Sequence, residues 1–288
     1  MIPPSFTYLR ASSVDEALGL AAEHGEDAKY LAGGHSLLPM MKLRMAFPEV
    51  LIDLGRITEL AYIRDGGSYV AIGAMTRHHD VATSPLLASA VPLLAHTAGE
   101  VGDPQIRHRG TIGGSVAHGD AASDLPATLL ALDATFVIRG ASGTRSVPGA
   151  EFFKSIFETA IEPGELLTEI QVPKPATPSA WSFQKFTKRK IDWAIVGVAV
   201  QGSLVQGSLV QGSSGRGSSV ALINMGLIPL RASAVETALA SGVSIAEAAA
   251  LAAEGTSAGS DIHATKAYRE HLARVLVKRG LAEAAARA

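Results

Sequence analysis

Two short segments, LAGGHSL at residues 31–37 and RGTIGGS at residues 109–115, place a glycine pair and hydroxyl-bearing residues between apolar stretches. Because glycine lacks a Cβ atom, backbone N–H groups in such a segment can turn towards a ligand at close range, and a serine or threonine hydroxyl can bind phosphate oxygens. Two loops of this kind predict a fold that clasps a pyrophosphate from both sides. A plain tight turn is the alternative for each segment taken singly.

Other nucleotide and catalytic motifs are absent from the sequence. Neither glycine segment matches the G-x-G-x-x-G dinucleotide pattern or the lysine-containing P-loop, which disfavours a nicotinamide-binding Rossmann fold and a nucleoside triphosphatase. Ser36 and Ser115 lie in no G-x-S-x-G elbow. The histidines lack the spacing of a metal site, so we expect no protein-bound metal.

Composition limits what the chain can do. It has 288 residues and no cysteine, which excludes disulfides, a thiol nucleophile and a cysteine-bound iron–sulfur cluster. If the chain moves electrons, an organic cofactor must carry them. A formal net charge of -2 leaves no basic surplus for nucleic acid or an anionic membrane. No apolar run reaches the roughly 20 residues of a transmembrane helix, and the start resembles no signal peptide, so we expect a cytoplasmic protein.

Hydrophobic patterning predicts an α/β (α+β) fold with three lobes, at residues 1–57, 58–175 and 176–288. The first has a helix that begins at the capping-box spacing Ser13 to Glu16 and ends at Gly25. Its remaining predicted elements are strands at 30–32 and 50–53 and a helix at 36–45. The second lobe has predicted strands at 69–72 and 135–139 and helices at 90–101 and 125–132.

From residue 166 the pattern changes to period-two strands, at 166–172, 181–187, 194–200 and 220–225, followed by alanine-rich helices. A third lobe of sheet and then helices fits this order. Residues 201–213 repeat QGSLV and then become rich in glycine and serine. We interpret this stretch as a long, mobile hairpin.

Three single positions have both a structural and a functional interpretation. Asp124 precedes Leu125-Pro126 at a predicted helix start, where it could serve as the N-cap, contact a ligand or do both. Lys185 opens a basic cluster with residues 188–190, which is either an exposed strand end or lies near an anionic cofactor. Trp193 either covers an aromatic ring system or fills the core.

Several long segments together resemble the FAD-binding medium subunit of molybdenum hydroxylases, and within that family the aerobic carbon monoxide dehydrogenases. They lie at residues 31–54, 72–78, 103–127, 159–173, 188–194 and 261–276, so the likeness spans nearly the whole chain. His35 favours the carbon monoxide branch, whereas Ser115, Ile191 and the QGSLV repeat depart from it.

The resemblance implies a vanillyl-alcohol-oxidase/PCMH-type region of two lobes that holds FAD without a covalent link, and a C-terminal lobe that closes over the flavin. Matched residue by residue, the two loops around the pyrophosphate would comprise Ala32, Gly33, Gly34, His35, Ser36 and Leu37, and Thr111, Ile112, Gly113, Gly114 and Ser115. Asp124 would contact the polar chain of the flavin. Leu167, Lys185 and Trp193 would lie beside the flavin ring.

The resemblance also implies partners. A large subunit would carry the molybdenum cofactor, a small subunit two 2Fe-2S clusters, and the complex would be a dimer of heterotrimers attached to the inner face of the membrane or free of it. Quinone is the expected acceptor, with oxygen, nicotinamide and a carrier protein as alternatives. No side chain of this chain would act as acid, base or nucleophile. A purine or N-heterocycle hydroxylase subunit, and a flavin-less scaffold or binding protein of the same fold, are the alternative functions.

Overall fold

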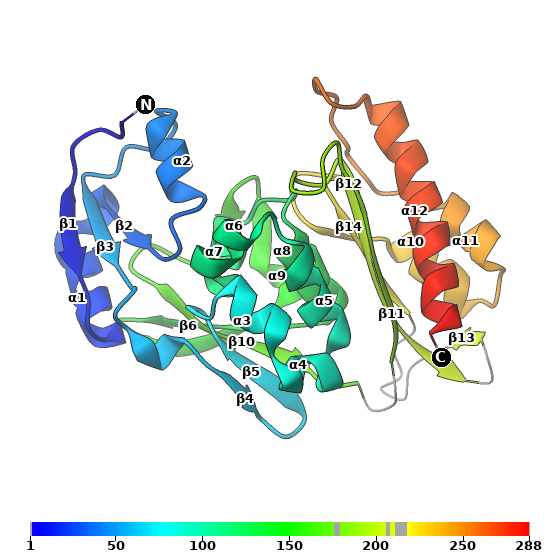
Figure 1. Cartoon of the computed structure of the whole chain (residues 1–288), viewed down its shortest axis with the longest axis horizontal. Coiled ribbons are helices and arrows are strands. Elements are labelled where there is room, and N and C mark those ends of the chain that lie inside the picture. The colour runs from blue at the N-terminus through cyan, green and yellow to red at the C-terminus, as the bar shows by residue number, and fades with distance from the viewer. Residues whose placement is uncertain (1, 176–178, 206–207, 211–217, 288) are drawn as a thin grey trace.

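The structure is a computed structural model that describes residues 2–175, 179–205, 208–210 and 218–287. Three sheets with their helices follow one another along the longest axis of the molecule (Figure 1). We name the three parts by their sheets: the N lobe around β1 to β3, the middle lobe around β4 to β7 and β10, and the C lobe around β11 to β15. In the described part of the chain, no helix is both long and apolar enough to cross a membrane.

The N lobe is a parallel three-stranded sheet in the order β1-β3-β2. Ser13 caps helix α1 by accepting the Glu16 N–H, and the helix ends at Gly25, as the sequence predicts. The Glu16 carboxylate bonds Ser12 instead of returning to Ser13, so only half of the predicted capping box forms. The elements are β1 (Thr7–Arg10), α1 (Val14–His24), η1 (Gly25–Asp27), β2 (Ala28–Leu31), α2 (Leu37–Lys42) and β3 (Val50–Asp53).

The middle lobe is an antiparallel sheet in the order β4-β5-β10-β6-β7. Its central strand is β10, so the period-two strand predicted from residue 166 belongs to this sheet and not to the one that follows it. The strands are β4 (Ile63–Asp65), β5 (Tyr69–Gly73), β6 (Thr135–Gly140), β7 (Gly143–Pro148) and β10 (Leu166–Pro173), with a small hairpin of β8 (Phe153–Ser155) and β9 (Glu158–Thr159).

Short helices cover this sheet, and most begin with a residue that caps or fits a helix start. Proline is the first residue of three of them, where its missing N–H costs nothing. The segment between β3 and β4 contains a short 3₁₀ helix, η2 (Thr58–Leu60). The helices are α3 (His78–Thr83), α4 (Pro85–Ala90), α5 (Pro92–Glu100), α6 (Pro104–Arg109), α7 (Ile112–His118), α8 (Asp124–Ala131) and α9 (Gly149–Phe152).

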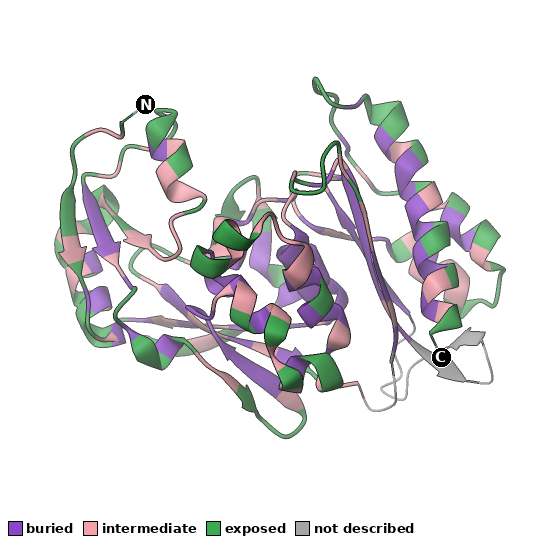
Figure 2. Ribbon diagram, viewed as in Figure 1, coloured by how far each residue is buried: buried purple, intermediate pink, exposed green. Residues whose placement is uncertain are grey.

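The C lobe is an antiparallel sheet with helices on one face. Its opposite face packs on α5 and α8, and Phe183, Ala199, Ala221 and Ile223 belong to the same hydrophobic cluster as the middle-lobe core. Figure 2 shows buried residues concentrated in the strands and helices where these two lobes meet. The elements are β11 (Ser179–Phe186), β12 (Val196–Val205), β13 (Ser208–Val210), β14 (Ser219–Ile223), β15 (Leu230–Arg231), α10 (Ser233–Ala240), α11 (Ile245–Ala250) and α12 (Lys266–Ala286).

The QGSLV repeat forms part of a hairpin. Strand β12 pairs with β13 in antiparallel register, with Ser203 opposite Val210. Residues 206–207 and 211–217 lie outside the described residues. The predicted mobility of this stretch therefore stays a prediction.

Candidate functional site

A cavity of about 1820 Å³ runs between the N and middle lobes and reaches the C lobe. It is larger than the roughly 300 to 1,000 Å³ of ordinary small-molecule pockets, so it has room for a dinucleotide. All the site residues predicted from the sequence line it except Ile112, which is fully buried in the middle-lobe core. The sequence motifs are therefore brought together from three lobes.

The first glycine segment has the geometry of an anion-binding loop. Among the described residues, none accepts a hydrogen bond from the backbone N–H groups of residues 33–37. Gly34 has φ of +76°, a left-handed conformation that favours glycine, and the chain turns there into helix α2. Successive free N–H groups around a left-handed turn form a concave site for an anion such as a phosphate.

The second glycine segment is different, because it is the start of helix α7 and not an open loop. The Thr111 hydroxyl caps the helix by accepting the Gly114 N–H. The N–H groups of Ile112 and Gly113 donate to the carbonyl oxygens of Thr76 and Ala74. The expectation that both glycine segments present free N–H groups is therefore wrong for this one.

The glycines themselves are needed for close packing between backbones. A Cβ atom on Gly33 would lie 2.4 Å from the Arg109 carbonyl oxygen, and one on Gly113 would lie 2.5 Å from the Ala74 carbonyl oxygen. Real Cβ atoms do not approach a backbone oxygen so closely. Gly33 thus lets the N-lobe loop lie directly on the segment that leads into helix α7.

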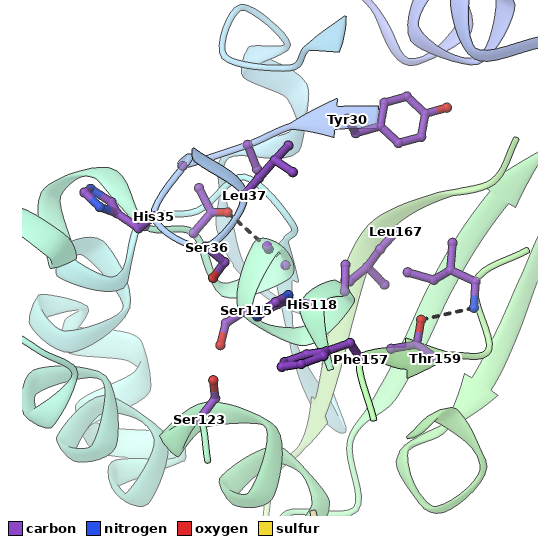
Figure 3. Close-up of a pocket in the computed structure, with 18 of the residues that line it drawn as sticks. Tyr30, His35, Ser36, Leu37, Ser115, His118, Ser123, Phe157, Thr159 and Leu167 are labelled. Atoms are coloured by element: carbon purple, nitrogen blue, oxygen red, sulfur yellow. Dashed lines mark hydrogen bonds between the residues drawn. The ribbon is translucent and has the colours of Figure 1, made fainter. Parts of the chain in front are cut away.

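Hydroxyl groups from two lobes face the same part of the cavity. Figure 3 shows Ser36 in the N lobe and Ser115 and Ser123 in the middle lobe around one space, with the Ser115 and Ser123 side chains pointing towards each other. Ser123 was not identified from the sequence, where it is one hydroxyl residue among several before a helix. The middle lobe thus offers the hydroxyl groups of Ser115 and Ser123 to a ligand, whereas the N-lobe segment at residues 33–37 offers backbone N–H groups.

Asp124 and Lys185 form a buried ion pair in the wall of the cavity. The Lys185 Nζ to Asp124 Oδ2 distance is 2.7 Å, and the side chains are 3% (Asp124) and 7% (Lys185) exposed. Lys185 also donates to the Glu100 carbonyl oxygen. Burial raises the pKa of Asp124 to about 6, although Lys185 opposes that rise.

The second oxygen of Asp124, Oδ1, is buried and has no hydrogen-bond partner among the described residues. A buried polar atom without a partner is costly, and it points to a donor that a ligand would supply. Asp124 is the first residue of α8 and Ser123 precedes it, so the N-cap interpretation of Asp124 is wrong. Its position in the cavity wall and its free oxygen favour ligand contact.

Trp193 lies at the edge of the cavity and is 69% exposed. The core-packing interpretation of this residue is therefore wrong. It belongs to the connection between β11 and β12, which also contains the basic residues 188–190, and Arg189 in that cluster pairs with Asp192. Lys188 and Arg189 line the cavity, so part of the basic cluster does lie at its edge.

Asn224 fixes the segment that carries Trp193. Its side-chain amide donates to the carbonyl oxygens of Ala194 and Ile195, at 2.8 and 3.3 Å, and its own N–H donates to the Ala121 carbonyl oxygen. Its φ of +61° is left-handed, a conformation that asparagine tolerates better than most residues. Asn224 therefore joins the β11–β12 connection to the turn that precedes Asp124.

We expect Asn224→Gly to loosen this connection without unfolding the C lobe. Glycine keeps the left-handed backbone and hence the bond to Ala121, but it removes both side-chain donors. Hydrogen exchange should then rise at the N–H groups of residues 192–195 and stay unchanged in the strands β12 and β14. Equal exchange in both proteins would show that the amide does not hold the segment.

Leu167 and Lys185, both expected beside the flavin ring, line the cavity from different lobes. Leu167 is buried in strand β10 of the middle lobe, and Figure 3 shows it near Thr159. Lys185 belongs to strand β11 of the C lobe.

Histidines also line the cavity. His78 is buried, its Nδ1 has no partner among the described residues, and burial lowers its pKa to about 4. Partial removal of the His35 side chain from water is the main cause that lowers its pKa, and the charge of Arg109 adds to this effect. In the described part of the chain, no group of three or more potential ligands is arranged to hold a metal ion.

The fold and the cavity define a protein with room for a dinucleotide between its lobes, and comparison with known proteins identifies its family. Residues 4–175 match the family "FAD binding domain in molybdopterin dehydrogenase", and residues 181–284 match "CO dehydrogenase flavoprotein C-terminal domain". The chain therefore belongs to the FAD-binding medium subunits of the molybdenum hydroxylases, which are oxidoreductase flavoproteins.

Individual relatives match over the full length. The chain is 42% identical to the carbon monoxide dehydrogenase medium chain of Hydrogenophaga pseudoflava, with 100% of this chain and 99% of the relative covered. It is 40% identical to subunit alpha of the 6-hydroxypseudooxynicotine dehydrogenase complex of Paenarthrobacter nicotinovorans, with coverage of 100% and 97%.

A solved structure of the carbon monoxide dehydrogenase from Hydrogenophaga pseudoflava, in a form that lacks the molybdenum–pyranopterin moiety, superimposes with a TM-score of 0.95. The two chains are 43% identical, and 100% and 99% of their lengths are covered. The predicted architecture, a two-lobed FAD-binding region followed by a lobe of sheet and helices, is confirmed.

Proposed function

We propose that this chain is the electron-transfer subunit of a molybdenum hydroxylase complex, and that FAD lies in the cavity between its three lobes. The observation that carries the proposal is the buried, unpartnered Oδ1 of Asp124 in the wall of a cavity whose opposite loop offers free N–H groups. An FAD molecule supplies a hydroxyl-bearing chain for the first and a pyrophosphate for the second. Bound FAD would accept electrons and release them to a second carrier.

The side chains and backbone of this chain bind and orient the cofactor. The N–H groups of residues 33–37 and the hydroxyls of Ser36 and Ser115 would hold the pyrophosphate. Asp124 would accept a hydrogen bond through Oδ1 while Lys185 stabilises its charge. Trp193 would cover the flavin ring from the β11–β12 connection and limit its contact with water. In this proposal residues 1–57 and 58–175 form the two lobes that bind FAD, and residues 176–288 form the lobe that closes over the flavin.

We propose the partners from the resemblance to the molybdenum hydroxylases. It implies two 2Fe-2S clusters on a small subunit and the molybdenum cofactor on a large subunit, in a dimer of heterotrimers. The sequence has no cysteine, which is consistent with a chain that holds flavin and no cysteine-bound cluster. Quinone is the proposed acceptor, which would bring the complex to the inner face of the cytoplasmic membrane.

Carbon monoxide is the substrate that we propose for the complex. The medium chain from Hydrogenophaga pseudoflava supports this choice, but the relative from a nicotine-derivative dehydrogenase is nearly as similar. A subunit for the hydroxylation of an N-heterocycle is therefore the second candidate. The substrate would bind on the large subunit, so the residues of this chain do not contact it.

The proposal is tested by isolating the complex from its native host. We expect flavin and iron–sulfur absorption in the visible spectrum, two co-purifying subunits, and bleaching of the flavin band by carbon monoxide. Bleaching by an N-heterocycle in place of carbon monoxide would assign the second candidate. A colourless single chain would sink the electron-transfer function and favour a flavin-less scaffold.

We predict that Trp193→Ala changes the rate of flavin reduction more than it changes FAD affinity. Trp193 lines the cavity from the β11–β12 connection of the C lobe, whereas the N–H groups of residues 33–37, which would provide most of the binding to phosphate, belong to the N lobe. Stopped-flow reduction and an FAD titration measure the two effects separately. Ile262→Ala is the matched control, because Ile262 is 95% exposed and does not line the cavity. Unchanged reduction kinetics in the tryptophan variant would contradict the assignment.

A further inference from the structure

Phe157 adopts a backbone conformation that a phenylalanine rarely adopts. Ser155 pairs with Glu158 in the β8–β9 hairpin, so Ile156 and Phe157 form its two-residue connection. The φ of Phe157 is +56°, in the left-handed region, where turns normally have glycine or asparagine. A bulky residue in this conformation is strained, and such strain persists where the side chain has a function that glycine could not supply.

The side chain of Phe157 lies in the cavity. It stacks on His118 from the end of α7, with ring centroids 4.9 Å apart and an angle of 22° between the planes. Figure 3 shows the two rings together between Ser115 and Thr159. Phe157 is nevertheless 47% exposed. His118 therefore supports one face of an aromatic ring whose remaining surface is available to a ligand.

The place of Phe157 along the cavity indicates which part of a dinucleotide it would meet. Lys185 and Trp193 line the cavity from the C lobe, Asp124 is paired with Lys185, and the free N–H groups of residues 33–37 belong to the N lobe. A further part of the lining consists of residues 25–26 and 28–30 of the N lobe and residues 140–142, 157–159 and 161–165 of the middle lobe. If the flavin half of FAD occupies the C-lobe side, the adenosine half extends into this part.

We propose that Phe157, backed by His118, is the stacking surface for the adenine ring of the dinucleotide. This inference rests on the proposed function and adds a binding residue to it. An adenine ring is planar and aromatic, so it gains most from a flat ring that is already held in place. The support from His118 and the fixed turn hold the phenyl ring before the ligand arrives.

The test compares four variants of the full chain in titrations with ADP and with FMN. Phe157→Ala and Phe157→Gly remove the ring, Phe157→Tyr keeps it, and Ile156→Ala is the matched control in the same turn. Ile156 is 58% exposed and does not line the cavity. We expect ADP affinity to fall about tenfold in the Ala and Gly variants, which equals about 1.4 kcal/mol. The Tyr and Ile156 variants should stay within about twofold of the original chain.

Two further readouts make the interpretation specific. FMN affinity should not change in any variant, because FMN lacks the adenine ring. Phe157→Gly should melt at a higher temperature than Phe157→Ala, because glycine removes the strain of the left-handed turn and alanine keeps it. Both variants should nevertheless lose ADP affinity equally.

Several results would overturn the inference. Unchanged ADP affinity in the Ala and Gly variants, or a loss confined to FMN, would remove Phe157 from the adenine site. An equal loss in Ile156→Ala would assign the effect to the turn instead of the ring. If the original chain binds neither FAD nor ADP, the proposed function fails together with this inference. If it binds both and the Phe157 variants match it, only this inference fails.

Discussion

Gly33→Ala is expected to lower FAD affinity by about a hundredfold, equal to roughly 3 kcal/mol, while most of the chain stays folded. The new Cβ atom would lie 2.4 Å from the Arg109 carbonyl oxygen and 2.7 Å from the Gly110 Cα atom. Both are backbone atoms, so a change of side-chain rotamer does not relieve the contact. The N-lobe loop must move away from the start of helix α7, which separates the free N–H groups from the hydroxyls opposite them.

FAD titration by fluorescence quenching measures this loss, and far-ultraviolet circular dichroism checks the fold. Gly19→Ala is the matched control, because a Cβ atom there meets nothing within 4 Å and alanine favours the helix that contains it. FAD affinity equal to that of the original chain in Gly33→Ala would mean that the two segments need not touch. Gly113→Ala is a poorer test of binding, because its Cβ atom would clash with Ala74 inside the middle lobe.

Lys185→Met is expected to destabilise the chain by about 3 to 5 kcal/mol at neutral pH, because it leaves the buried Asp124 carboxylate without its cation. The loss should depend on pH. Burial already raises the folded-state pKa of Asp124 from 3.8 to about 6, and Glu100 adds to the rise. Without Lys185 that pKa rises further. A raised folded-state pKa gives stability that is present below the unfolded pKa and lost as pH rises through the folded one.

Near pH 4, where Asp124 is protonated, the variant should therefore be almost as stable as the original chain. The difference in stability between the two should be largest above pH 6. Urea unfolding of the variant and the original chain across this range measures the difference. The double variant Asp124→Leu, Lys185→Met provides the control, since an apolar pair removes the unpaired charge and should recover most of the stability. It should still bind FAD poorly. Recovery of FAD binding in the double variant would show that Asp124 contributes only to the fold.

Patterning predicted the elements that depend on local sequence. Strands β3 and β5 are short buried apolar runs, and helix α1 has an N-cap and a terminal glycine, so their positions could be predicted. Strand β1 was missed because three of its four residues are exposed, which hides any alternation. The sheet to which β10 belongs could not be predicted, because a period-two pattern gives a strand but does not give its neighbours.

The same limit applies to the site. The two glycine segments, Asp124 and Lys185 were found from motifs and from the resemblance, and the structure brings them to one cavity. A glycine pair does not reveal whether its N–H groups are free, since that depends on the carbonyl oxygens of Ala74 and Thr76 in a distant segment. Phe157, His118 and Asn224 were missed because only the folded chain places them at the cavity. For Phe157 the local indication is its place in the two-residue connection of the β8–β9 hairpin, where a glycine or an asparagine is usual.

The shared core of the middle and C lobes has a consequence for synthesis on the ribosome. The N lobe has its own hydrophobic cluster, to which the middle lobe adds Leu60, Met75 and Leu166, and its strands are complete once residue 53 has emerged. The apolar surface of α5 and α8, in contrast, stays uncovered until β11, β12 and β14 have been made. The nascent chain must therefore keep this surface from aggregating until the strands of the C lobe leave the ribosome, and we expect chaperones to bind it at this stage.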